Sequence, residues 1–242
     1  MNTIKRIVCL ALLLALLCGD GLALEKCKLQ KETDETFTVQ IQRKKPAPDN
    51  WFKKTWIMGD SVSESLANYE VIPNLKVFHK TGQSPRGALR NHHYVVDGKY
   101  LTMAERMVLR KPQKLLLMLG SNGIDHEKLS SVKQEYHELV DYLIENLPGC
   151  EIYLLAVTPV APVATKRYPK LSMANIQSFN EEMMEIAKTH GLHYVDIFTP
   201  LLSEDGKRIQ IGFNTGDGIH LTQKGAQAVA DAIRMQVGEE KK

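Results

Sequence analysis

The segment Trp56-Ile57-Met58-Gly59-Asp60-Ser61-Val62-Ser63-Glu64-Ser65 joins a short apolar run to a polar one. The apolar run ends at Gly59, and a carboxylate and a hydroxyl follow at once. Residues 56–58 predict a buried strand, and residues 61–69 predict a helix that begins directly after the turn. Ser61 by itself is typical of a helix N-cap at such a turn, and a nucleophile is the alternative interpretation.

The same order of strand and helix repeats along the rest of the chain. Further strands are predicted at residues 75–79, 115–119, 152–157 and 194–197. Amphipathic helices are predicted at residues 103–109, 132–147, 173–187 and 226–237. Strands that alternate with helices indicate parallel strands joined by right-handed helical crossovers. We therefore expect an α/β fold, a three-layer α/β/α sandwich around a five-stranded, mainly parallel sheet.

Composition supports one compact domain and argues against one class of partner. The chain has 242 residues, of which 43% are hydrophobic, enough to build a sizeable core. Lysine and arginine number 31 against 28 aspartate and glutamate residues, and no long basic run or basic helical face occurs. Nucleic acid is therefore not expected as a partner.

The N-terminus has the pattern of a secretory signal, which we place at residues 1–23. Lys5 and Arg6 precede an uncharged apolar run of about twelve residues, and Gly21-Leu22-Ala23 supplies small residues for cleavage. The run is shorter than the roughly 20 residues of a membrane span, so cleavage is favoured over anchoring. Lipidation of Cys18 is disfavoured because Leu17 precedes it. We expect a secreted or cell-envelope protein with no stable membrane span after cleavage.

Two segments are expected after the signal. Residues 24–50 form an N-terminal extension or linker, in which the alternating residues 37–41 favour a short strand. Residues 51–238 form the domain. Only Cys27 and Cys150 remain in the mature chain, and whether they pair stays open. No Cys-x-x-Cys motif occurs, and His92-His93 is read as a solvated loop, so no metal site is expected.

Polar residues follow several predicted strands. They are Gly59-Asp60-Ser61, Thr81-Gly82-Gln83-Ser84, Gly120-Ser121-Asn122-Gly123 and, before the closing helix, Asp217-Gly218-Ile219-His220-Leu221-Thr222. The carboxyl ends of parallel strands meet at one edge of a sheet, where such folds place their sites. We therefore expect these segments to converge despite their separation along the chain.

The converging residues have the types that ester cleavage requires. Ser61 would be the nucleophile and His220 its base, with Asp217 fixing the imidazole through its other nitrogen. Backbone N–H groups of Ser61 and Gly82, together with the Asn122 amide, would hold an oxyanion. Each residue also has an ordinary explanation by itself: a capping serine, a surface or core histidine, a turn aspartate, a turn glycine and a loop amide. Their order after successive strands favours the catalytic interpretation.

These four blocks resemble those of the SGNH (GDSL-type) hydrolase family over about residues 55–236. The resemblance implies Ser61 as nucleophile, an Asp217–His220 pair, and the oxyanion donors Ser61, Gly82 and Asn122. It also implies that Asp60 supports the serine, that the sheet is flavodoxin-like with order 2-1-3-4-5, and that no metal or cofactor is needed.

The chain departs from the family pattern at three places. Val62 replaces the leucine of the family name, Gly123 follows Asn122 where many members have aspartate, and Gly87 is a second candidate for the glycine block. No Gly-x-Ser-x-Gly elbow occurs, which argues against the α/β-hydrolase fold. The spacing Ser130-x-x-Lys133 resembles a β-lactamase motif, but it lies at the start of an amphipathic helix and lacks the companion motifs.

Three functions are compatible with these residues. The first is a secreted serine esterase that forms an acyl-enzyme, with an acetylated carbohydrate as the substrate class that family analogy favours. The second is an O-acetyltransferase of a cell-wall or exopolysaccharide that uses the same residues. The third is a catalytically dead carbohydrate-binding module, against which the complete residue set argues. Acyl chain length, the alcohol and the oligomeric state stay open.

Overall fold

A five-stranded parallel sheet forms the centre of the computed structural model, which describes residues 45–237. Its strands, in spatial order, are β2 (Lys76–His79), β1 (Thr55–Gly59), β5 (Lys114–Met118), β6 (Glu151–Leu155) and β7 (His193–Val195). Numbered by their place along the chain, these strands have the order 2-1-3-4-5. The α/β fold class and the strand order expected from the sequence are both confirmed.

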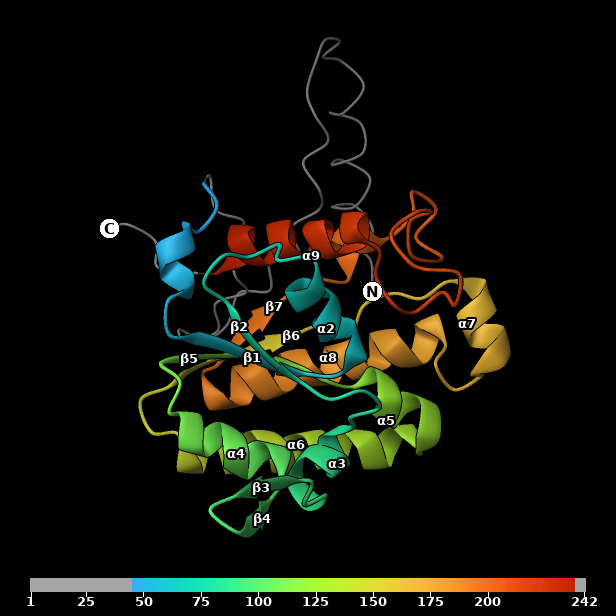
Figure 1. The fold of residues 1–242 in the computed structure, drawn as a ribbon. Helices are drawn as coiled ribbons and strands as arrows, with labels where there is room; N and C mark the ends of the chain where they lie inside the picture. The colour runs from blue at the N-terminus through green and yellow to red at the C-terminus, as the bar shows by residue number, and fades with distance from the viewer. Residues whose placement is uncertain (1–44, 238–242) are drawn as a thin grey trace, which may run out of the picture. The chain divides into compact units, whose positions relative to one another are not determined.

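Helices cover both faces of this sheet (Figure 1). On one face lie α2 (Ser61–Asn68) and α9 (Gln223–Gln236). On the other lie α4 (Met103–Arg110), α6 (Leu129–Asn146) and α8 (Met173–His190). The central strand β5 is buried on both sides, since Leu115, Leu116 and Leu117 are all 0% exposed. This burial explains its unbroken apolar sequence.

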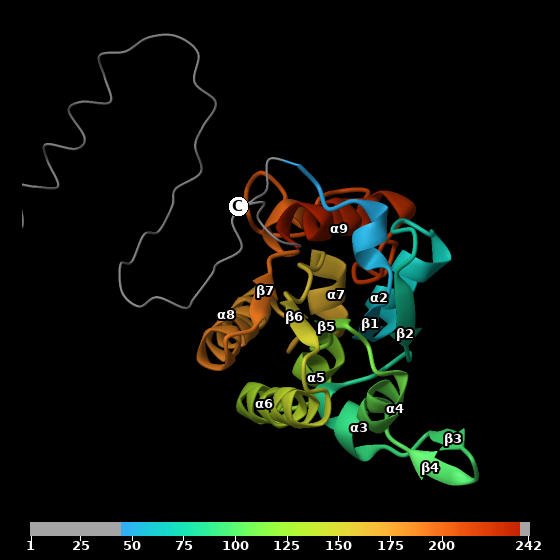
Figure 2. The same ribbon diagram turned by 90° about the vertical axis from the view of Figure 1, so that its left-hand side faces the viewer.

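Several short elements have no counterpart in the sequence prediction. They are the helices α3 (Pro85–Arg90), α5 (Ser121–His126) and α7 (Pro162–Arg167), the 3-10 turns η2 (Asp49–Phe52) and η3 (Thr199–Leu201), and the hairpin of β3 (Tyr94–Val96) and β4 (Lys99–Leu101). The hairpin extends outward beside α3 and α4 (Figure 2). Asp97 and Gly98 have φ values of 50° and 75°, as in a type I′ turn. The dipeptide Asp-Gly between apolar residues was therefore a usable signal.

The last predicted strand ends earlier than expected, at Val195. One carboxylate oxygen of Asp196 accepts hydrogen bonds from the N–H groups of Phe198 and Thr199, both at 2.9 Å. These bonds turn the chain out of the sheet, so residues 196 and 197 do not continue β7.

The segment before β1 is attached to the helical layer. Ala47 N–H donates to the Arg234 carbonyl on α9 at 2.7 Å, and the Arg234 guanidinium contacts Asp49 at 2.6 Å. Phe52 in η2 is fully buried. The proposed signal, the predicted strand at residues 37–41 and Cys27 lie outside the described residues. Cys150 has no disulfide partner within residues 45–237, so its pairing with Cys27 is not tested. Within residues 45–237, no helix is long and apolar enough to span a bilayer.

The stability of the helical layer should depend on pH through Glu135 on α6. Burial, and then the nearby Glu127 carboxylate, raise the pKa of Glu135 from 4.5 to about 7, against the opposing charge of Arg86. An acid whose pKa is higher in the folded state binds an extra proton on folding, so stability falls as pH rises between these two values. We expect Glu135→Gln to remove this loss. The melting temperature of the variant, relative to that of the wild type, should therefore rise as the pH increases from 5 to 8.

Thermal denaturation of both proteins, followed by circular dichroism at these two pH values, measures the effect. Glu145→Gln is a matched control, because Glu145 lies on the same helix, its side chain is exposed, and it is not one of the charges that raise the pKa of Glu135. Parallel pH profiles for the wild type and Glu135→Gln would contradict the assignment.

Candidate active site

Ser61 lies at the sharp turn between β1 and α2. Asp60 is the N-cap of α2, because its carboxylate accepts the N–H of Val62 at 2.9 Å, and Ser61 is the first helical residue. The interpretation of Ser61 as the cap is therefore wrong, since the side chain of Asp60 makes the capping bond. Gly59 permits the turn to be this tight. A Cβ at Gly59 would lie 2.9 Å from the Met118 carbonyl oxygen and 2.6 Å from Ser63 Cβ.

The structure brings Ser61, His220 and Asp217 together in one hydrogen-bonded line. The Ser61 hydroxyl oxygen lies 2.9 Å from His220 Nε2, although 159 positions separate the two residues. His220 Nδ1 lies 2.6 Å from Asp217 Oδ2. The second distance is that of a short, charge-assisted hydrogen bond. The arrangement fits a proton on Nδ1, which leaves Nε2 free to accept the serine proton.

Asp217 is held as a carboxylate by a set of local donors. Its Oδ1 accepts the Thr215 hydroxyl at 2.8 Å and the N–H groups of Ile219 and His220 at 2.8 and 3.1 Å. Burial acts to raise the pKa of Asp217, but these donors and the His220 ring outweigh it and hold the pKa well below its usual value. Asp217 therefore stays ionised at neutral and at mildly acidic pH.

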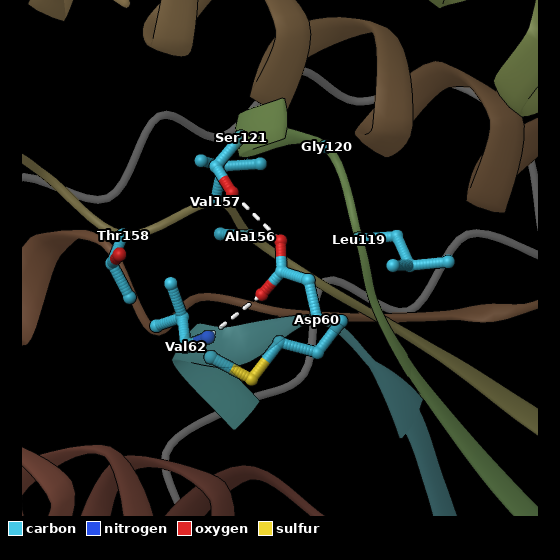
Figure 3. Close-up of a pocket in the computed structure, with 9 residues that line it drawn as sticks. Asp60, Val62, Leu119, Gly120, Ser121, Ala156, Val157 and Thr158 are labelled. Carbon is cyan, nitrogen blue, oxygen red and sulfur yellow. Dashed lines mark hydrogen bonds between the residues drawn. The ribbon is translucent and has the colours of Figure 1, made fainter. Parts of the chain in front are cut away.

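Asp60 links the serine turn to the Asn122 segment after β5. Its Oδ2 accepts the Ser121 hydroxyl at 2.7 Å and the Asn122 side-chain amide at 2.9 Å. Figure 3 shows the Asp60 carboxylate between Ser121 and the Val62 N–H, where it lines a small pocket. Burial raises the pKa of Asp60, and these donors act against the rise. The sequence placed Asp60 here as a support, and its bonds are consistent with that role.

Gly82 and Asn122 lie at the same pocket as Ser61. Gln83 N–H donates to the Lys80 carbonyl, and Gly82 has a φ of +74°, which favours glycine in this turn. Among residues 45–237, the backbone N–H groups of Ser61 and Gly82 have no protein acceptor. The Asn122 amide instead donates to Asp60 at 2.9 Å and to the Gln83 carbonyl at 3.3 Å.

Gly87, the alternative glycine, lies inside α3, where its N–H donates to the Ser84 hydroxyl. It does not line the pocket, so Gly82 is the better match in position.

The pocket at Ser61 has a volume of about 190 Å³. Its wall includes residues that the sequence did not single out, namely Asp125, His126, Tyr168, Leu171 and Ile219. Tyr168 and Leu171 come from the loop after α7. The N–H of Ala161, the N-cap residue of α7, donates to the Gly218 carbonyl. No sequence period marks this loop, so the sequence pattern could not have pointed to it.

The described residues offer no place for a metal ion. Within residues 45–237, no group of three histidine, cysteine, aspartate or glutamate side chains is arranged to bind one. His92 and His93 lie in an exposed loop, as expected from the sequence. Ser130 and Lys133 lie in the first two turns of α6, away from the residues that line the Ser61 pocket.

Comparison with known families decides where this fold belongs. The model of the GDSL-like Lipase/Acylhydrolase family matches residues 80–228. The chain belongs to this family. Membership supports an ester hydrolase activity, in agreement with the resemblance seen in the sequence. The matched residues include Gly82, Asn122, Asp217 and His220 but begin after Ser61, so the placement of Ser61 depends on the geometry described above.

Solved structures share the GDSL-like fold. A Streptococcus pneumoniae protein provisionally described as a platelet activating factor is 21% identical, with a TM-score of 0.60 and coverage of 75% of this chain and 82% of that one. A GDSL-like lipase from Bacteroides thetaiotaomicron is 16% identical, with a TM-score of 0.55 and coverage of 77% and 88%. A serine-to-alanine mutant of an acetyl esterase, solved with acetate, is 15% identical, with a TM-score of 0.53 and coverage of 74% and 93%. None of the curated proteins is similar enough to count as a match.

Proposed function

We propose that this protein is a secreted serine esterase that cleaves short acyl groups from a carbohydrate through an acyl-enzyme. The observation that carries the proposal is the line from Ser61 to His220 to Asp217, with separations of 2.9 and 2.6 Å. A serine hydroxyl is a weak nucleophile and needs an adjacent base that is itself oriented by a third group.

The reaction follows from the positions of these atoms. Ser61 Oγ attacks the ester carbonyl carbon as His220 Nε2 takes its proton. The bond from carbon to the alcohol oxygen then breaks, and His220 returns the proton to the leaving alcohol. Water attacks the acyl group on Ser61, gives a proton to His220, and releases the carboxylic acid as Ser61 Oγ regains its proton. The positive end of α2 adds to the stabilisation of charge at Ser61.

The oxyanion would be held by N–H groups at the turn. Those of Ser61 and Gly82 have no protein acceptor among the described residues, so they are available. Asn122 would have to release one of its two bonds. The bond to the Gln83 carbonyl is the longer, at 3.3 Å, and the bond to Asp60 at 2.9 Å would keep the amide in place. Asp60 thus positions the third donor without contacting the substrate.

The size of the pocket supports a short acyl group. Pockets for drug-sized ligands measure about 300–1,000 Å³. The volume here is about 190 Å³. Similarity to an acetyl esterase solved with acetate points in the same direction. The pattern at residues 1–23 supports export.

Labelling with a fluorophosphonate tests the nucleophile directly. The reagent phosphonylates a serine only when a base activates it, so we expect stoichiometric labelling of the wild type, mapped to Ser61 by peptide mass spectrometry. Ser121 is a matched internal control, because it lines the same pocket but donates to Asp60. Folded protein that stays unlabelled, or that is labelled at Ser121, would refute the assignment and favour a binding module.

A further inference from the structure

A carboxylate inside the active-site pocket has no role in the mechanism above. Asp125 lies three residues after Asn122, in α5, and lines the same pocket as Ser61 and His220. Its side chain is only 15% exposed. The adjacent His126 ring has its Nδ1 at 3.5 Å from Asp125 Oδ2, and its side chain is 69% exposed. Within residues 45–237, no group donates a hydrogen bond to the Asp125 carboxylate.

A carboxylate in this position constrains what can fill the pocket. A buried or half-buried carboxylate needs hydrogen-bond donors, and losing them costs free energy. Water supplies these donors in the open pocket. A substrate that displaces the water must replace them. Hydroxyl groups do so, whereas an aliphatic group leaves the carboxylate unpaired and an anionic group is repelled by it.

Two cations lie beside the pocket but do not line it. Among the described residues that line the pocket, Asp125 is the one with a carboxyl group, and no lysine or arginine is among them. The Lys170 ammonium donates to the His126 carbonyl at 3.1 Å, and the Arg167 guanidinium lies 5.2 Å from the Tyr168 ring centre. Both cations lie outside the pocket wall.

The other residues of the pocket wall match the apolar faces of a sugar ring. Tyr168, Leu171 and Ile219 offer apolar surface in the same pocket. A sugar ring has apolar C–H faces and an edge of hydroxyl groups. A long acyl chain would match the apolar residues but would leave Asp125 without a donor.

We infer that Asp125 is a specificity-determining residue, which selects esters whose alcohol part carries hydroxyl groups and disfavours aliphatic and anionic ones. The inference builds on the proposed esterase function of Ser61 and concerns the part of the substrate that the pocket would recognise, which is the alcohol. Asp125 takes no proton and forms no covalent bond in this role.

Two acetate esters with different alcohols test the inference in the full chain. One is a monoacetylated methyl glucoside, and the other is p-nitrophenyl acetate, whose alcohol has no further hydroxyl group. A hydrogen bond to a charged group contributes about 1.5–3 kcal/mol, so Asp125→Ala should lower kcat/KM for the glucoside ester by about 10–100-fold. For p-nitrophenyl acetate, whose ring offers the wild-type carboxylate no donor, the same substitution should raise kcat/KM instead of lowering it.

A third ester separates selectivity from a structural role. For a monoacetylated methyl glucuronide, whose alcohol carries a carboxylate, Asp125→Asn removes a repulsion and should raise kcat/KM by about fivefold. Damage to the fold could not produce such a gain.

Equal losses on the glucoside and nitrophenyl esters, or no loss on either, would overturn the inference alone. So would a wild type that cleaves only p-nitrophenyl acetate. A wild type that cleaves neither ester and resists the fluorophosphonate would overturn the proposed function, and this inference with it.

Discussion

Replacing Ser61 by alanine is expected to lower kcat/KM for p-nitrophenyl acetate by about 10⁴-fold or more. The hydroxyl is the atom that would form the acyl-enzyme, and no other described hydroxyl lies against His220 Nε2. The fold should be unaffected, because Asp60 and not Ser61 caps α2, and alanine is a good helix former. Initial rates, together with thermal unfolding of the same samples, measure both parts of the prediction.

Ser65→Ala is the matched control for this substitution. Ser65 lies on the same helix one turn later, and its hydroxyl donates to the Val62 carbonyl at 2.7 Å. It does not line the pocket, so its loss should cost about 1 kcal/mol of stability and little activity. A folded Ser61→Ala protein with the activity of the wild type would eliminate Ser61 as the nucleophile.

The central sheet could be predicted because its strands are buried on both faces. Leu115, Leu116 and Leu117 form an apolar run that has no other stable place in a domain of this size. The polar residues at the strand ends follow from the same reasoning, since parallel strands direct them to one edge. The proximity of Ser61 and His220 could therefore be predicted from the sequence.

The short elements could not be predicted from hydrophobic periodicity. The helices α3, α5 and α7 have six residues each, too few to show a helical stripe. Their boundaries depend on local signals such as the Ser84 cap and Pro85 of α3, or on packing. Gly123 in α5 is an example of packing, because a Cβ there would lie 2.7 Å from a Val132 methyl group. The absence of a side chain at Gly123 thus lets α5 lie against α6.

Bonds between distant side chains were the hardest part of the site to foresee. The sequence placed Asp60 and Asn122 near Ser61 but could not show that the Asn122 amide donates to Asp60, 62 positions away. Asp125 was missed for the same reason. The proposed role of Asp125 depends on the pocket that it lines and on its lack of hydrogen-bond donors. Neither property can be seen from the sequence of α5 alone.

Asp217→Asn is expected to lower kcat by about 10²–10⁴-fold with little change in KM. The replaced side chain can still accept bonds from Thr215 and Ile219, so the loop should persist. Its amide would, however, donate to His220 Nδ1, which forces the ring proton onto Nε2. The imidazole then has the wrong tautomer to accept the proton of Ser61, while substrate binding is unaffected. Steady-state kinetics with p-nitrophenyl acetate separate kcat from KM.

The low pKa of Asp217 adds a pH test to this substitution. A carboxyl group whose pKa is depressed on folding contributes stability above its unfolded value of 3.8, and that contribution is lost as pH falls further. The wild type should therefore exceed Asp217→Asn in melting temperature by a constant margin from pH 5 to pH 8, and this margin should shrink below pH 4. Thr215→Val, which removes one donor to Asp217, should show the same trend more weakly and keep most of the activity. Equal loss of kcat in both variants would mean that the geometry of the loop, and not the tautomer of His220, limits the reaction.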